Sequence, residues 1–180
     1  MKKLISNRKL TLVLVLCAVT ICAVTAYATV VSVRLALGTI PASEQFNGGP
    51  ADMAVTQITM QPGDTIPWHY HPGVAYVVLK SGTVTEDNGC GGSEVFTAGQ
   101  AFEEPVPRVH QVRNTGSVPA ELYATIIVPA GQPRTINTGG PLCGPPANKD
   151  QCKDNGWMNF NFPRGFESQG DCVSSIQAGK

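Results

Sequence analysis

Residues 63–71 read GDTIPWHYH, and residues 99–114 read GQAFEEPVPRVHQVRN. These two stretches contain all three histidines of the protein, His69, His71 and His110. Successive side chains of a β-strand alternate between its two faces, so His69 and His71 point the same way if this stretch is a strand. A third imidazole from a neighbouring strand would complete a compact group of nitrogen donors. The spacing therefore predicts one metal site formed by His69, His71 and His110.

The composition predicts one all-β domain with a modest appendage. The chain has 180 residues, of which 42% are hydrophobic, and it contains 19 glycines and 14 prolines. This mixture predicts many turns and few helices. Charged residues make up only 14% of the chain, with 13 acidic and 13 basic side chains. No basic surface of the kind that nucleic acids require is indicated, so we expect no nucleic-acid partner.

Short runs of alternating polarity, separated by turn-forming residues, fill the middle of the chain. Strands this short and evenly spaced are typical of a sandwich or barrel. We predict strands at residues 53–60, 65–70, 74–80, 83–86, 94–96, 101–103, 109–114 and 120–128.

The N-terminal residues 1–28 have the features of a targeting segment. Four basic residues precede an uncharged run over residues 10–33. The triplet Ala26-Tyr27-Ala28 suits cleavage by signal peptidase before Thr29. The run is also long enough for an uncleaved membrane anchor. We favour cleavage because residues 30–37 also have the pattern of a strand. Both alternatives place the protein outside the cytoplasm, secreted or anchored, with membrane contact only through this segment.

The remaining chain divides by composition. A strand and a loop at 41–50 precede the barrel, and a linker rich in proline and glycine follows it. The last segment is too short to bury much apolar area, so a disulfide or docking onto the barrel must hold it. The predicted segments are 29–51 (strand and loop), 52–130 (barrel), 131–148 (linker) and 149–180 (C-terminal unit).

Four cysteines lie beyond the targeting segment, an even number that predicts disulfides in an oxidising compartment. Zinc binding is the lesser alternative, because no C-x-x-C spacing occurs. Three pairings are open for the four candidates, Cys90, Cys143, Cys152 and Cys172.

The two histidine stretches resemble the two motifs of the cupin superfamily, and the chain is similar to its small, single-domain, cupin type 2-like members that carry an export signal. The resemblance covers residues 52–128 and implies a jelly-roll β-barrel with His69, His71 and His110 as metal ligands. It also implies a small-molecule ligand in the barrel and leaves room for a homodimer. The matching positions are Gly63, His69, His71 and Gly82 for the first motif, and Gly99, Pro105, His110 and Asn114 for the second.

Two positions depart from the family pattern. A proline, Pro107, replaces the glycine of the second motif. The glutamate ligand of the first motif would stand at Ala75, which has no lone pair. Strand alternation turns the adjacent Tyr76 outward, so only a bulge or a register slip would bring its phenol to the metal, and we favour a surface aromatic. We therefore expect a three-histidine site, similar to those of cysteine and diketone dioxygenases, without a fourth protein ligand.

Three neutral imidazoles suit iron, manganese, zinc, nickel or copper, whereas Mg²⁺ and Ca²⁺ prefer oxygen ligands. An open coordination position on such an ion would attract a small chelating or anionic molecule. The sequence does not rank the metals. The alternative is a barrel that keeps its histidines but uses no metal.

Other polar side chains lie close to the second motif. Glu104 resembles a glutamate that precedes the same proline in many small cupins. It is either an acid or base behind the metal ligands or, with Glu103, part of a solvated rim. Arg108 and Arg113 are candidates for pairing with a carboxylate at the cavity mouth, although an exposed arginine is the commoner outcome.

Three functions fit these features. The first is an exported metal-dependent oxygenase that acts on a small chelating or anionic molecule. The second is a non-catalytic module that binds metal or a small ligand, and the third is a structural domain. The C-terminal end resembles a short tail found in various exported bacterial proteins, from which no activity follows. We hypothesise a Cys152–Cys172 bridge within this tail and a Cys90–Cys143 bridge that ties it to the barrel.

Overall fold

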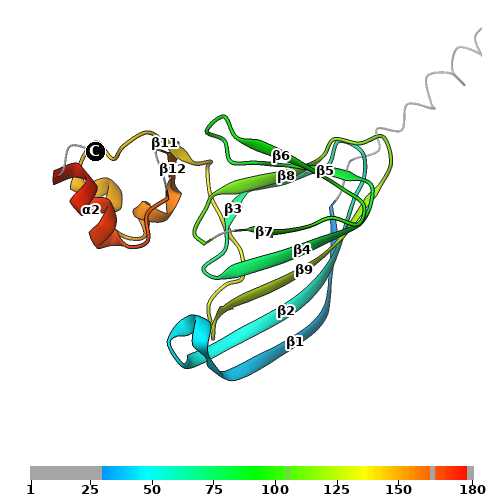
Figure 1. Cartoon of the computed structure of the whole chain (residues 1–180), viewed down its shortest axis with the longest axis horizontal. Helices are drawn as coiled ribbons and strands as arrows, with labels where there is room; N and C mark the ends of the chain where they lie inside the picture. The colour runs from blue at the N-terminus through cyan, green and yellow to red at the C-terminus, as the bar shows by residue number, and fades with distance from the viewer. Residues whose placement is uncertain (1–29, 105, 163–164, 178–180) are drawn as a thin grey trace, which may run out of the picture.

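The computed structural model describes residues 30–104, 106–162 and 165–177. Two five-stranded antiparallel sheets face each other and form the main body of the molecule (Figure 1). Their strand orders are β1-β2-β9-β4-β7 and β10-β3-β8-β5-β6. This confirms the predicted all-β jelly-roll fold. The bounds are β1 (Val31–Ser43), β2 (Gly49–Met60), β3 (Thr65–Tyr70), β4 (Val74–Ser81), β5 (Thr83–Asp87), β6 (Ser93–Thr97), β7 (Ala101–Glu104), β8 (His110–Asn114), β9 (Ala120–Pro129) and β10 (Ile136–Asn137).

Alternation along the central strands creates the core between the sheets. Every second residue of β9 is buried, from Ala120 to Val128. In β4, Ala75 and Leu79 are fully buried whereas Tyr76 is 46% exposed. The predicted outward position of Tyr76 is therefore confirmed. Burial of one leucine side chain contributes about 2 kcal/mol, so the core faces of β4 and β9 fix the register of the first sheet.

The N-terminal strand is longer than predicted. It begins at Val31 and continues to Ser43 because it pairs with β2 along this length. The predicted loop at residues 41–50 is therefore wrong at both ends, which belong to β1 and β2. Between these strands, the chain reverses through the 3-10 turn η1 (Glu44–Phe46) and Asn47. Asn47 adopts a φ of 52° and Gly48 a φ of 80°, the left-handed backbone that a tight reversal uses.

The predicted targeting segment, its cleavage position before Thr29 and its alternative as an anchor lie outside the described residues. Within the described ranges, no helix has both the length and the apolar character needed to cross a bilayer.

Residues 131–148 form more structure than a linker. The short strand β10 pairs with the edge of β3, and β11 (Leu142–Cys143) pairs in parallel with β12 (Phe160–Phe162). Two-residue strands leave no periodic signal in a sequence rich in proline and glycine. Their pairing keeps this segment against the barrel and satisfies backbone groups at the edge of β3.

The C-terminal unit lies at one end of the barrel, beside β11 (Figure 1). Its elements are η2 (Lys149–Cys152), η3 (Gly156–Asn159), β12 and α2 (Gln169–Gln177). Both hypothesised disulfides are present: Cys152–Cys172 closes the unit, and Cys90–Cys143 joins the β5–β6 turn to β11. The buried side chains of the unit are Cys152, Phe160, Phe166 and Cys172.

Candidate metal centre

The structure brings the three predicted histidines together. His69 lies in β3 opposite His110 in β8, and His71 follows the last residue of β3. Their ring centroids are 4.3–5.5 Å apart. All three residues are at most 5% exposed. The pairing of β3 with β8 thus converts the His-x-His spacing and the distant His110 into one buried cluster.

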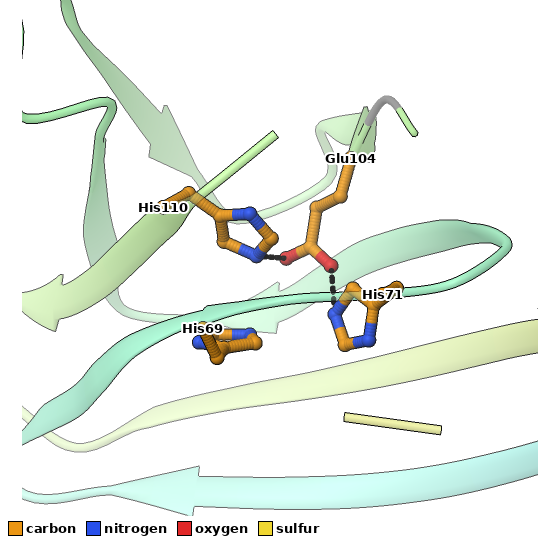
Figure 2. A group of neighbouring side chains, drawn as sticks. All are labelled: His69, His71, Glu104 and His110. Carbon is orange, nitrogen blue, oxygen red and sulfur yellow. Dashed lines mark ion pairs between the residues drawn. The ribbon is translucent and has the colours of Figure 1, made fainter. Parts of the chain in front are cut away.

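Glu104, the last residue of β7, joins this cluster. Figure 2 shows its carboxylate between His71 and His110. Its Oε2 lies 3.0 Å from Nε2 of His71, and its Oε1 lies 3.5 Å from Nε2 of His110. The side chain is buried, with 6% of the residue exposed. One potential ligand atom from each of the four residues lies within 4.8 Å of the others, so the group is compact enough to surround one ion.

The position of Glu104 bears on two expectations from the sequence. Ala75 faces Glu104 directly in the pairing of β4 with β7. A carboxylate therefore reaches the cluster from the strand next to the one that carries the alanine, and it is a candidate fourth ligand that the sequence analysis did not expect. The rim alternative is wrong for Glu104, because only Glu103 is exposed. Strand register, which the sequence does not reveal, brings this carboxylate to the histidines.

Backbone carbonyls orient the three imidazoles. The Nδ1 atoms of His69, His71 and His110 lie 2.7, 2.5 and 2.9 Å from the carbonyl oxygens of Pro67, Arg134 and Arg108. With hydrogen on Nδ1 as the donor, each Nε2 keeps a lone pair, as metal coordination requires. The buried Nε2 of His110 makes no well-formed hydrogen bond within the described structure. A buried nitrogen without a hydrogen-bond partner, next to a carboxylate, fits the coordination of a cation.

In the metal-free cluster, the pKa values of His69 and His110 shift in opposite directions. Burial and the neighbouring charge of His110 lower the pKa of His69 to about 4. Burial also opposes a charge on His110, but the carboxylate of Glu104 outweighs it and raises the pKa of His110. Burial alone would raise the pKa of Glu104, whereas His110 and His71 lower it. The carboxylate is therefore ionised and sits where a cation would gain most from it.

A cavity of about 550 Å³ opens onto the cluster from inside the barrel. Its walls are mostly apolar, but two basic residues that the sequence analysis did not single out, Arg34 and Arg134, also line it. The two arginines that it did single out are exposed: Arg113 pairs with Asp87 at 3.8 Å, and Arg108 lines a separate cavity of about 540 Å³ on the His110 side.

The C-terminal unit contacts the backbone next to a candidate ligand. Oδ1 of Asn161 in β12 accepts a hydrogen bond from the N–H of Val109 at 3.1 Å, and its Nδ2 donates to the Val109 carbonyl at 2.5 Å. The same Nδ2 donates to the Asn88 carbonyl at 2.7 Å. Val109 is fully buried and immediately precedes His110. Asn161 therefore positions the start of β8, a role that no local sequence pattern indicates.

Replacing Asn161 with alanine should weaken both the fold and metal binding. The change leaves the buried N–H and carbonyl of Val109 unpaired, at a cost of about 2 kcal/mol. Loosening of the neighbouring ligand is expected to lower metal affinity about tenfold. The matched control is Asn159→Ala, which removes a contact with the hydroxyl of Thr138 and leaves the contacts of Val109 with Asn161 in place. Thermal unfolding and metal titration measure the two effects; equal metal affinities in both variants would show that Asn161 does not position the site.

Comparisons with known proteins agree with this architecture. A family model described as a cupin domain matches residues 56–128. A search of curated proteins found no match. Similar solved structures include a conserved protein from Streptococcus pyogenes, with 17% identity, 57% of this chain and 77% of that chain covered, and a TM-score of 0.44. A cupin superfamily protein from Desulfitobacterium hafniense has 11% identity and a TM-score of 0.43, with 56% of this chain and 78% of that chain covered.

A third similar structure is the cupin domain of an XRE family transcriptional regulator from Enterobacter cloacae, with 20% identity, coverage of 58% and 98%, and a TM-score of 0.39. At these scores, the similarities carry no argument about function. The family match, the two facing sheets and the histidine motifs agree with one another. Residues 56–128, which are 73 of the 180 residues, therefore match the model of a cupin domain.

Proposed function

We propose that the protein binds a divalent transition metal through His69, His71, His110 and Glu104. The observation that carries this proposal is the convergence of four buried donor groups within 4.8 Å. Three nitrogen donors and one carboxylate suit iron, manganese, zinc, nickel or copper better than Mg²⁺ or Ca²⁺. The carbonyl contacts of the three Nδ1 atoms support it, because they hold the rings ready for a metal on Nε2.

We further propose that the protein is an oxygenase acting on a small chelating or anionic molecule. A redox-active ion at the site would supply the electron-transfer chemistry for such a reaction. The chain would contribute the rest: Glu104 offsets one positive charge of the ion, the apolar walls exclude water, and the cavity holds the ligand. A volume of about 550 Å³ falls in the range of small-molecule sites.

A second candidate function is a non-catalytic module that binds metal or a small ligand. One observation favours it: Glu104 is the only acidic side chain lining the cavity in the described part of the chain, and two histidines already engage it. No second carboxylate is left on this wall for proton transfer. A structural domain without a ligand is the third candidate, and the metal analysis below separates it from the other two.

We also propose that the protein works outside the cytoplasm, either secreted or anchored by its N-terminal segment. Two disulfides support this location, since the cytosol keeps most thiols reduced.

The test combines metal analysis with oxygen consumption. The full chain is purified under metal-replete conditions, next to His110→Ala and the control Gln111→Ala, which changes the neighbouring residue on the opposite face of β8. We expect about one transition-metal ion per chain in the wild type and in Gln111→Ala, and little in His110→Ala. Oxygen uptake with a panel of small carboxylates and chelators supports the oxygenase, whereas metal without uptake supports the binding module. A metal-free wild type would overturn the proposed site.

A further inference from the structure

The cavity above the four candidate metal ligands has an uneven charge distribution. Arg34 and Arg134 both line it, and Glu104 is the only acidic side chain that does so among the residues described. Glu104 is engaged by His71 and His110. No carboxylate of the described chain forms an ion pair with either arginine. The cavity therefore has two basic groups without a matching acid, before any metal is counted.

Asp52, an acid whose pKa Arg134 lowers slightly, is held by other groups. Asp52 accepts hydrogen bonds from the N–H of Gly131 at 2.9 Å and from the Thr39 hydroxyl at 2.7 Å. Those two contacts lower the pKa of Asp52 most, and the charge of Arg134 contributes least. Asp52 does not line the cavity. The guanidinium of Arg134 is therefore available to a ligand.

The two arginines reach the cavity from different sides. Arg34 lies in the edge strand β1, opposite Thr56 of β2, and a register shift follows it directly. It is exposed, at the mouth of the cavity. Arg134 is half-buried, and its carbonyl oxygen accepts the hydrogen bond from Nδ1 of His71. The backbone that orients a candidate metal ligand thus also carries a cationic side chain of the cavity.

Most of the remaining wall is apolar, with Ser32, Thr56 and Thr135 as its uncharged polar residues. Aliphatic side chains from both sheets face the interior, together with one aromatic ring. A ligand that fills about 550 Å³ must bury carbon against these side chains. The apolar lining residues are Val30, Ile58, Ile66, Val77, Phe102, Val112, Leu122, Ala124, Ile126 and Pro133.

We propose that Arg34 and Arg134 bind the carboxylate of a small amphiphilic acid, whose apolar part occupies the barrel above the four candidate metal ligands. A guanidinium presents paired N–H donors that match the two oxygens of a carboxylate. The apolar wall selects against small inorganic anions, which cannot bury carbon there. The inference deepens the proposed function and rests on it for the role of the metal, whereas the anion contacts belong to the chain itself.

The experiment uses hexanoate as the probe and hexanamide as its neutral match. Binding to the metal-free wild-type chain is measured by NMR titration of backbone amides. We expect hexanoate to bind at least about ten times more tightly than hexanamide, with shifts in β2 and β9. Arg134→Ala and Arg34→Ala should each weaken hexanoate binding about tenfold or more. The control Arg113→Ala, which removes an exposed arginine outside the cavity, should have no effect.

Several outcomes would overturn this inference. These are equal binding of hexanoate and hexanamide, unchanged affinity in both cavity variants, or binding of inorganic phosphate in preference to hexanoate. Metal content is measured separately in each variant. Hexanoate bound by a wild type that takes up no metal would refute the proposed function but keep the carboxylate site. If the wild type binds metal but shows no arginine-dependent preference for hexanoate, the carboxylate site is refuted and the proposed metal site is kept.

Discussion

Replacing Glu104 with glutamine should lower the affinity for a divalent transition metal by at least about a hundredfold. Glutamine preserves the size of the side chain but removes the negative charge that lies 3.0 Å from Nε2 of His71. Mutation of a residue that hydrogen-bonds to a metal ligand typically lowers metal affinity about 10–100-fold. Removal of a residue that itself coordinates the metal should lower the affinity at least as much. The change also removes the carboxylate that raises the pKa of His110. Titration against a competing chelator measures the affinity.

The matched control is Glu103→Gln on the same strand. Glu103 is exposed and faces away from the cluster, so this variant changes the net charge of the protein equally but should bind metal as the wild type does. If both variants kept full affinity while His110→Ala lost the metal, the site would be formed by three histidines and Glu104 would lie outside it.

The double substitution Cys152→Ala/Cys172→Ala should unfold the C-terminal unit. The bridge closes a loop with a sequence separation of 20 residues, for which loop entropy predicts a loss of about 3 kcal/mol. Among the described residues of this unit, the two cysteines are also half of the buried core, beside Phe160 and Phe166. Little apolar burial is left to offset that loss. Hydrogen exchange should therefore show lost protection in η2, η3 and α2.

The barrel provides an internal control in the same measurement. Protection in β4 and β9 should persist, because their core contacts do not involve the C-terminal unit. We expect partial loss at Val109, whose backbone is paired with Asn161 of that unit. Unchanged exchange throughout residues 149–177 would contradict the view that the bridge holds the unit together.

Much of the barrel was predictable because its strands are amphipathic. Each predicted strand between residues 53 and 128 matches an observed strand to within a few residues, since alternation and turn residues carry that information locally. The extension of β1 to Ser43 and the short strands β10 and β11 were not predicted. Pairing with a partner strand, rather than a local pattern, determines how far these strands extend.

The candidate site was predicted in part for the same reason. His69 and His71 share a face by simple alternation, whereas Glu104 reaches them only through the register that places it opposite Ala75. Arg34, Arg134 and Asn161 belong to segments far from the motifs in sequence. Their roles depend on cavity shape and on backbone contacts that a single sequence does not display.

The sequence by itself determined the β-fold, the burial pattern of the central strands and the three histidines, because periods of two residues and motif spacings are local properties. Only the tertiary structure decided that a carboxylate joins the histidines, that two arginines face the same cavity and that the C-terminal unit holds the backbone before His110. These are contacts between residues distant in sequence, and strand register and the path of the connecting segments determine them.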